Sequence, residues 1–387
     1  MAALTHVPVT LSPDQSPTKT AMRDIIAAFF PKEWPFVDPE TLTLSYSTTF
    51  ANPHCKVERA VPITGTAIEP LKLLIKFHND SMADMEVFKH LVPTKQEEAL
   101  ISLEFGRSGL GAKVYGFFKT EDGTLGRIDE FIDGRGLKPE DVEDSGIQAD
   151  IARGLARFHT LDFDLDGKEV TGRGFSEALV QGLRRYQGMK KLEEFGRHAG
   201  VDIDRLIDYD FATAVEEVVE KLESLNAKKA WCIHDVQYGN IIVRNHPQPG
   251  KSKTVLVDFE FAMRNFRAFD IGGHFMQKIF DWYGQDSKIV NCREYLEEER
   301  RYFCDEYARE WNIRTGDSDT GDEVFVEAEY GVLLAVAFDV HNMLCAMEEE
   351  GGDDPLSLLG LNELYGAFVK QFNKLDGARR SLSGASR

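Results

Sequence analysis

Short runs of β-favouring residues dominate the first third of the chain. Between about residues 42 and 133, the runs "TLTLSYSTTF", "LKLLIKF", "KVYGFF" and "GRIDEFI" are separated by turn residues. Such runs, rich in β-branched and aromatic residues, predict short strands. One helical segment, roughly residues 93–107, interrupts them. The pattern therefore predicts a small sheet of meander type with a single helix packed on it.

After "DGRGLKPEDV" the hydrophobic pattern becomes helical. Apolar residues recur along one helix face at Ile147, Ile151, Leu155 and Phe158, and an apolar stripe between residues 211 and 225 has the same spacing. Residues 241–259 read as a hairpin buried between helices, and residues from 290 onward are again helical. No internal repeat is evident.

These patterns divide the 387 residues into two lobes that share a cleft. The fold class is α+β, with a small β-rich N-lobe and a larger, mostly helical C-lobe. We expect a flexible arm over residues 1–20, an N-lobe over 21–135, a C-lobe over 136–376 and a flexible tail over 377–387.

The charge balance narrows the range of partners. The chain has 65 acidic and 45 basic residues and a net charge of −20. This balance disfavours nucleic acid or an anionic membrane as the main partner, because both are bound through clustered Lys and Arg. A cationic small molecule suits this field, whereas a nucleotide requires local Lys or Mg²⁺.

Cysteine use and the termini favour a cytoplasmic protein. Five scattered cysteines form neither CxxC pairs nor a readable disulfide framework, so we expect reduced thiols. The N-terminal residues lack the pattern of a signal peptide, and the most apolar stretch, "GVLLAVAF", is too short to span a bilayer. We expect no stable membrane insertion, and the sequence leaves open a homodimer.

Two aspartates and an asparagine form the strongest chemical motif. Asp235 is followed five residues later by Asn240, and after the predicted hairpin "VDFE" contains Asp258 and Glu260. Kinase-like enzymes use this order: the first Asp orients or accepts the hydroxyl proton, and Asn and the second Asp hold Mg²⁺ on the phosphates. Either motif alone is often a turn, but their joint occurrence predicts a phosphotransferase with Glu260 as an additional metal ligand.

A lysine within a predicted strand is the candidate phosphate contact. Lys76 lies in "LKLLIKF" and is either an exposed edge residue or a ligand of the nucleotide phosphates that pairs with a helix glutamate. Glu98 is the first choice for this glutamate and Glu97 the second. The loop that covers the phosphates should lie in "SYSTTFANPHCKV", which lacks glycine, so that hydroxyl groups would contact phosphate there, from Ser45, Ser47, Thr48 and Thr49.

The segments "HDVQYGNIIV" and "VLVDFEFAMRNFRAFDIGGHF" resemble the choline/ethanolamine kinase family. Its members read close to H-N-D-x-Q-x-G-N-I-L followed by I-D-[FY]-E-Y-A-x-x-N-Y-R-x-F-D-I-G-N-H-F, and weaker likeness extends over most of the chain. The resemblance implies a protein-kinase-like fold and transfer of the ATP γ-phosphate to the hydroxyl of choline or ethanolamine. That reaction is the first step of phosphatidylcholine or phosphatidylethanolamine synthesis.

Carried over to this chain, the resemblance implies specific roles. Asp235 would be the catalytic base, Gln237 would lie beside the substrate hydroxyl, and Asn240, Asp258 and Glu260 would surround Mg²⁺. Asp270 would anchor the catalytic core. The family's loop histidine is replaced by Ile233, which predicts a loop that is braced differently but remains catalytic.

The amine pocket departs further from the family. The positions that match an acidic residue and two tryptophans of the family read Gln277, Asp339 and Asn342, while Trp282 and Phe338 still offer aromatic surface. An aspartate in place of an indole favours an amine that donates hydrogen bonds over trimethylammonium, which is best held by aromatic faces. Alternatively, Trp282 is simply a core residue and the alignment of the last helices is shifted.

Two other functions compete with this interpretation. One is a kinase of the same fold with an aminoglycoside, a sugar or an amino acid as acceptor, although "NFRAFDIGGHF" is not usual there. The other is a catalytically impaired nucleotide-binding protein, suggested by Ile233 and the glycine-free loop.

Overall fold

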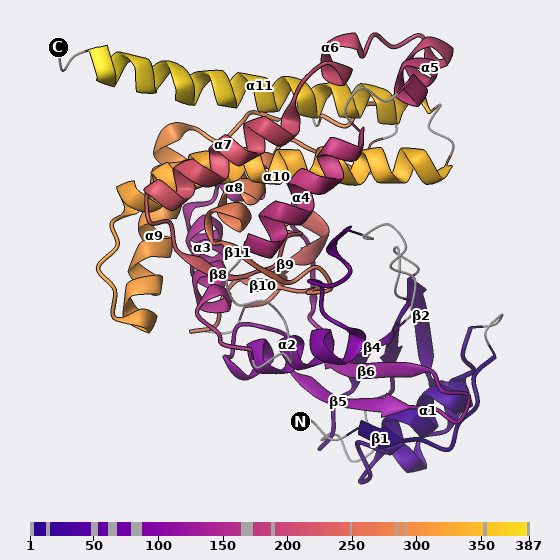
Figure 1. Cartoon of the computed structure of the whole chain (residues 1–387). Helices are drawn as coiled ribbons and strands as arrows, with labels where there is room; N and C mark the ends of the chain where they lie inside the picture. The colour runs from indigo at the N-terminus through magenta and orange to yellow at the C-terminus, as the bar shows by residue number, and fades with distance from the viewer. Residues whose placement is uncertain are drawn as a thin grey trace.

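The chain folds into a β-rich lobe and a larger helical lobe, which lie at opposite ends of the molecule in Figure 1. The computed structural model describes residues 4–12, 16–47, 53–60, 68–78, 87–163, 173–186, 190–247, 250–282, 284, 286–289, 292–350 and 354–384. All statements below concern these residues.

A six-stranded sheet forms the β-rich lobe, in the order β1-β5-β6-β4-β3-β2. Its strands are β1 (Leu4–His6), β2 (Thr43–Ser47), β3 (His54–Glu58), β4 (Lys72–His78), β5 (Val114–Lys119) and β6 (Leu125–Glu130). β2, β3 and β4 pair antiparallel in sequence order, but β4 continues to β6 rather than β5. The predicted meander is therefore interrupted where the chain leaves the sheet to form a helix.

The first residues contribute to this sheet. β1 pairs parallel with β5, with Leu4 opposite Phe117, and α1 (Lys19–Ala27) buries Met22, Ile25 and Ile26 against the same lobe. This differs from the loose arm expected over residues 1–20, because the apolar residues of these elements have a sheet edge and a sheet face to pack on.

The helix between β4 and β5 is α2 (Lys95–Arg107), close to the predicted segment 93–107. A capping box fixes its start: the Thr94 hydroxyl accepts from the Glu97 backbone N–H, and the Glu97 carboxylate accepts from the Thr94 N–H. This start places Glu98 on the buried face of α2. In Figure 1, α2 lies where the sheet meets the helical lobe.

The helical lobe contains short strands among its helices. The strands are β7 (Gly134–Gly136), β8 (Lys229–Cys232), β9 (Ile241–Arg244), β10 (Thr254–Leu256) and β11 (Met263–Phe266). β9 and β10 form the predicted hairpin, to which β7 adds, and β8 pairs with β11. The helices are α3 (Ser145–His159), α4 (Arg173–Tyr186), α5 (Lys190–Ala199), α6 (Asp204–Ile207), α7 (Phe211–Ser224), α8 (Ala268–Gln277), α9 (Glu297–Thr315), α10 (Gly321–Glu350) and α11 (Pro355–Gly384).

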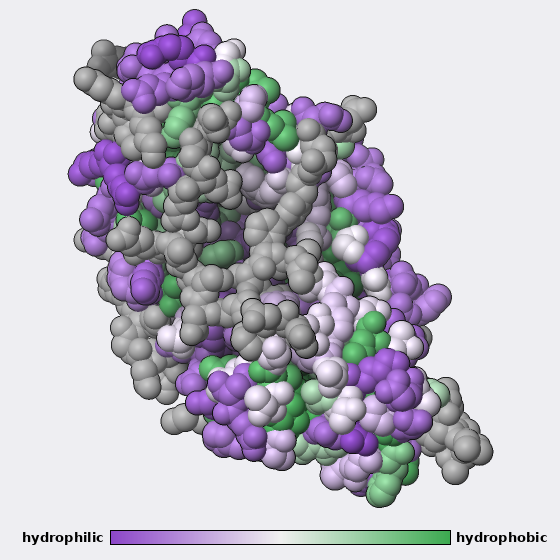
Figure 2. Space-filling view, turned by 90° about the vertical axis from the view of Figure 1, so that its right-hand side faces the viewer, coloured by the Kyte–Doolittle hydropathy of each residue, from purple (hydrophilic) through white to green (hydrophobic). Residues whose placement is uncertain are grey.

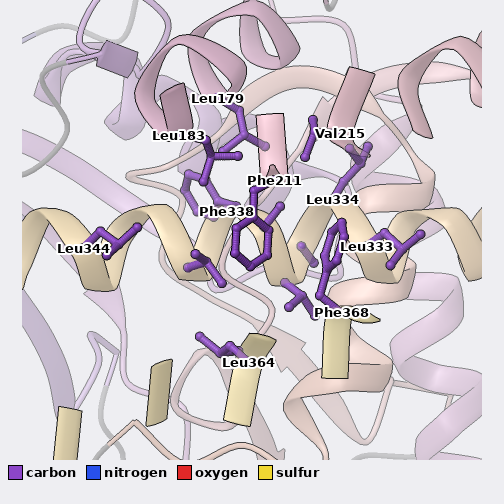
Figure 3. Close-up of a cluster of buried hydrophobic side chains, with 14 of the residues drawn as sticks. Leu179, Leu183, Phe211, Val215, Leu333, Leu334, Phe338, Leu344, Leu364 and Phe368 are labelled. Carbon is purple, nitrogen blue, oxygen red and sulfur yellow. The ribbon is translucent and has the colours of Figure 1, made fainter. Parts of the chain in front are cut away.

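α10 is the central helix of this lobe. Leu333, Leu334 and Phe338 on α10 pack among side chains from α4, α7 and α11 (Figure 3). Within the described residues, α10 is long and apolar enough to cross a membrane by composition, but 67% of that window is buried inside the protein. Helices that form a protein core pass the same test, and α10 is such a helix here.

The C-terminal helix is longer than the sequence predicts. α11 runs on to Gly384, through the stretch for which the sequence predicts a tail from residue 377. On the coloured part of the face shown in Figure 2, hydrophobic residues lie in patches among hydrophilic ones.

Candidate active site

The loop after β8 holds the candidate base. Asp235 Oδ2 accepts hydrogen bonds from Asn240 Nδ2 at 2.7 Å and from Gln237 Nε2 at 3.0 Å. Burial raises the pKa of Asp235 to about 7, and the negative charge of Asp258 adds to this effect, while the two amide hydrogen bonds oppose it. The predicted trio of Asp235, Gln237 and Asn240 is therefore brought together.

Asp270, at the start of α8, braces this loop. Its carboxylate accepts from the backbone N–H of Ile233 at 2.6 Å and of His234 at 2.9 Å, and His159 Nε2 donates to it at 2.9 Å. Burial favours the neutral acid, but these hydrogen bonds bring the pKa of Asp270 below its ordinary value. The Ile233 side chain is buried in the core, so bracing passes through its backbone rather than its side chain.

His234 fixes the sharp turn before the base. Its φ of 64° lies in the left-handed region, which a non-glycine residue adopts only when its surroundings hold it there. The ring Nδ1 donates to the Cys232 carbonyl at 3.1 Å, and Asn265 Nδ2 donates to Nε2 at 3.0 Å. Burial lowers the pKa of His234 to about 4, so the ring is neutral at physiological pH.

Lys76 joins the two lobes. It lies inside the sheet on β4 and is 1% exposed, which excludes the alternative of an exposed edge residue. Its Nζ donates to Glu98 Oε1 and to Asp258 Oδ1, both at 2.8 Å. Burial alone would raise the pKa of Glu98, but Lys76 and Arg127 bring it well below its ordinary value. The predicted Lys76–Glu98 pair is present, while Glu97, the second choice, caps α2 instead.

The predicted metal ligands lie just after β10. Asp258 has a φ of 65°, a strained conformation that turns its carboxylate toward Lys76. Glu260 Oε2 lies 3.3 Å from Lys95 Nζ. Burial and the charge of Asp258 raise the pKa of Glu260, while the positive charges of Lys76 and Lys95 oppose this effect.

A cavity of about 350 Å³ lies between the sheet and the strands β7, β9 and β10. Its apolar walls suit a planar base and are formed by Leu74, Val114, Ile132, Ile242 and Leu256. Lys76, Asn240 and Asp258 line the same cavity. Its dimensions and this division into apolar and charged surface are those of a site for a small molecule.

The predicted phosphate-covering loop is only partly described. Ser47 ends β2 opposite His54, which in turn lies opposite Lys76, so Ser47 is two strands away from the lysine. Thr48 and Thr49 lie outside the described residues. The phosphate role of Ser47 therefore stays a prediction.

The residues predicted for the amine pocket have different environments. Phe338 is a core residue that packs against Phe175, Phe269 and the His234 ring. Trp282 packs against Phe280, with ring centroids 4.6 Å apart. The packing of Trp282 agrees with the alternative that it is a core residue, and Phe338 lies in the same hydrophobic cluster.

The polar candidates have features expected of residues that line a pocket, namely partial exposure or a polar atom without a hydrogen-bond partner. Asp339 on α10 is partly exposed, and burial together with the nearby charge of Asp235 raises its pKa well above the ordinary value. Gln277 is 7% exposed, and its Oε1 has no hydrogen-bond partner among the described residues. Asn342 is partly exposed, and its Oδ1 lies 3.4 Å from the Nδ1 of His341. Asp339 is thus the pocket candidate for which the structure gives proximity to Asp235.

Sequence reasoning missed three residues of the site: Arg127, Lys95 and His159. Arg127 is a charged residue inside a strand, as Lys76 is, and its Nη1 lies 3.3 Å from Glu98 Oε1; the same signal could have identified it. His159 ends a helix whose apolar face is readable, but its partner Asp270 is distant in sequence. Nothing in the local sequence indicates that Lys95 reaches Glu260.

Comparison with known proteins adds an independent finding. The family model described as choline/ethanolamine kinase matches residues 54–349. A human choline/ethanolamine kinase is 26% identical over 239 residues, covering 62% of this chain and 54% of that protein. A probable ethanolamine kinase of Arabidopsis thaliana is 30% identical over 190 residues, covering 48% of this chain and 45% of that protein. The matches thus span about half the length of these curated relatives.

The fold has counterparts among solved structures. A choline kinase from Cryptosporidium parvum superposes with a TM-score of 0.64 at 13% identity, covering 90% of this chain and 93% of that chain. At this identity the likeness concerns the fold alone, which is the two-lobed, protein-kinase-like architecture.

Proposed function

Since the chain belongs to the choline/ethanolamine kinase family, we propose that it transfers the γ-phosphate of ATP to the hydroxyl of an amino alcohol of the choline or ethanolamine type. One observation carries the proposal: Lys76 donates to both Glu98 and Asp258 at 2.8 Å. A lysine held between a helix glutamate and a metal-binding aspartate is the arrangement that kinases use to position phosphates.

The donor set fits Mg²⁺. Asp258 and Glu260 offer carboxylate oxygens, and Asn240 offers its amide oxygen because its nitrogen is engaged by Asp235. Hard oxygen ligands of this kind suit Mg²⁺. When bound, the cation would neutralise charge on the phosphates of ATP. Lys76 would bind the phosphates, and the 350 Å³ cavity would hold the base.

Asp235 would accept the proton of the acceptor hydroxyl. A carboxylate whose pKa is near 7 is a competent base at neutral pH. Its hydrogen bonds to Gln237 and Asn240 hold Oδ2 in place, and Asp270 fixes the loop through its backbone. Asp339, close to Asp235, would face the amine end of the acceptor.

The product would be a phosphorylated head group for phosphatidylcholine or phosphatidylethanolamine synthesis. We place the reaction in the cytoplasm, a proposal supported by the five free thiols, which suit a reducing compartment.

The test is ADP formation with a panel of acceptors: ethanolamine, choline, an aminoglycoside and a sugar. Turnover should occur with an amino alcohol, and Asp235→Asn should lower kcat about 10²- to 10⁴-fold. Asp258→Ala should abolish turnover, whereas Glu298→Gln, an exposed control on α9, should not change it. Turnover only with the aminoglycoside or sugar would refute the acceptor, and ATP binding without any turnover would refute the kinase activity.

A further inference from the structure

A second lysine crosses from the N-lobe to the candidate metal ligands. Lys95 is the first residue of α2, and its Nζ lies 3.3 Å from Glu260 Oε2. The side chains of Lys95 and Glu260 are 12% and 13% exposed, so water screens their interaction only in part. This contact is separate from the Lys76–Asp258 pair, although the two lie side by side on the same segment 258–260.

The two lysines are held differently. Lys76 has two acceptors at 2.8 Å, Glu98 Oε1 and Asp258 Oδ1. Lys95 has Glu260 at 3.3 Å and Glu98 Oε2 at 3.7 Å, the latter beyond hydrogen-bond range. Because Lys95 extends along a flexible stem from the end of a helix, its ammonium can leave Glu260 at lower cost than the Lys76 ammonium can leave its partners.

The Lys95 ammonium and a divalent metal ion would compete for the Glu260 carboxylate. An ammonium at hydrogen-bonding distance reduces the negative charge available to a divalent cation on that oxygen, and the two cations also repel each other. A metal that binds Glu260 before nucleotide must therefore compete with Lys95 for this carboxylate. A nucleotide changes this balance, because its phosphate oxygens offer the ammonium a new partner.

We propose that Lys95 is a positioning residue that couples nucleotide binding to metal binding. Its ammonium neutralises Glu260 until nucleotide binds and then moves to the phosphates, so that Glu260 becomes available to the metal. Nucleotide and metal then favour each other's binding, and this coupling is reciprocal. The inference rests on the proposed function, since it requires a nucleotide and a cation at this site.

Two separate binding measurements on the full chain test the inference. The first is the affinity for Mn²⁺ alone, without nucleotide, by electron paramagnetic resonance. The second is the affinity for a non-hydrolysable ATP analogue in EDTA, by calorimetry. Lys95→Met should tighten Mn²⁺ binding and weaken metal-free nucleotide binding, each on the order of fivefold. A merely structural role of Lys95 would weaken both together.

Two further variants complete the design. Lys95→Arg keeps the charge and should retain both wild-type affinities, whereas Lys72→Met removes an exposed lysine that pairs with Glu58 on the sheet and should change neither. Unchanged or jointly weakened affinities in Lys95→Met, with normal binding by the wild type, would overturn this inference alone. If the wild type binds neither Mn²⁺ nor the analogue, the proposed function fails as well.

Discussion

A carboxylate and an indole bind an ammonium group through different interactions. A carboxylate accepts hydrogen bonds from N–H groups, which a primary ammonium has and a quaternary ammonium lacks, whereas an aromatic face attracts either through its quadrupole. Asp339 lies near Asp235, and a bound ammonium group would favour its ionised form, so the wild type should prefer ethanolamine to choline. We expect Asp339→Trp to raise the ratio of kcat/KM for choline over ethanolamine, and Asp339→Asn to lower kcat/KM for ethanolamine about tenfold. An unchanged ratio in both variants would place Asp339 outside the pocket.

The same residue predicts a pH dependence of stability. The pKa of Asp339 is raised well above 3.8, so the folded chain keeps a proton that the unfolded chain releases at about pH 4. The stabilisation is fully present below the unfolded pKa and is lost as pH rises through the folded pKa. The unfolding free energy of Asp339→Asn relative to wild type should therefore increase with pH above about 4, by at most about 1.4 kcal/mol per pH unit. Urea titrations between pH 5 and 8 measure this difference, and a constant difference would contradict a raised pKa of Asp339.

At the scale of elements, the crossing of α8 over α10 positions Asp270 and therefore the proposed catalytic loop. Gly331 and Gly272 allow the close approach, because a Cβ on Gly331 would lie 1.8 Å from the Ala268 carbonyl oxygen and one on Gly272 2.2 Å from the Val332 nitrogen. We expect Gly331→Ala to lower the unfolding free energy by about 3 kcal/mol and to reduce activity through α8. Gly366→Ala on α11 is the matched control: nothing lies within 4 Å of its added Cβ, so this variant should gain about 0.5–1 kcal/mol. Denaturant unfolding of both variants gives the comparison, and equal effects would contradict the close crossing.

Elements with strong periodicity or capping signals are readable from the sequence. The helix after Thr94, the apolar face of α3 and the hairpin of β9 and β10 lie close to their predicted places. β1 and the pairing of β4 with β6 are not readable, because partner choice in a sheet depends on contacts between residues distant in sequence. For the same reason, the resemblance implies Asp270 as an anchor of the catalytic core, but the sequence does not indicate its partner His159 or its hydrogen bonds to the backbone of Ile233 and His234.

At the scale of the whole molecule, cation–carboxylate contacts connect the two lobes. The motif spacing predicts Lys76, Glu98 and Asp258 as one group, and the structure brings them together. Lys95 and Arg127 join this group only through folding, since their carboxylate partners come from other elements. The net charge of −20 makes such lysines the local positive charge that a polyanionic nucleotide needs.

Because both lobes line the cavity proposed for the nucleotide, a bound nucleotide should stabilise the chain as a unit. A ligand that binds only the folded protein at 100 times its dissociation constant adds about 2.7 kcal/mol, which should raise the Tm by several degrees. We expect a Mg²⁺ complex of a non-hydrolysable ATP analogue to produce this shift in wild type and in the Lys72→Met control.

Lys76→Met should reduce the shift, because the phosphates would lose their buried lysine. The substitution should also leave Glu98 and Asp258 without that partner. Differential scanning calorimetry with and without the analogue separates the two effects: the Tm of the free variant reports the lost ion pairs, and the ligand-induced shift reports phosphate binding. A full shift in Lys76→Met would mean that the nucleotide binds without this lysine.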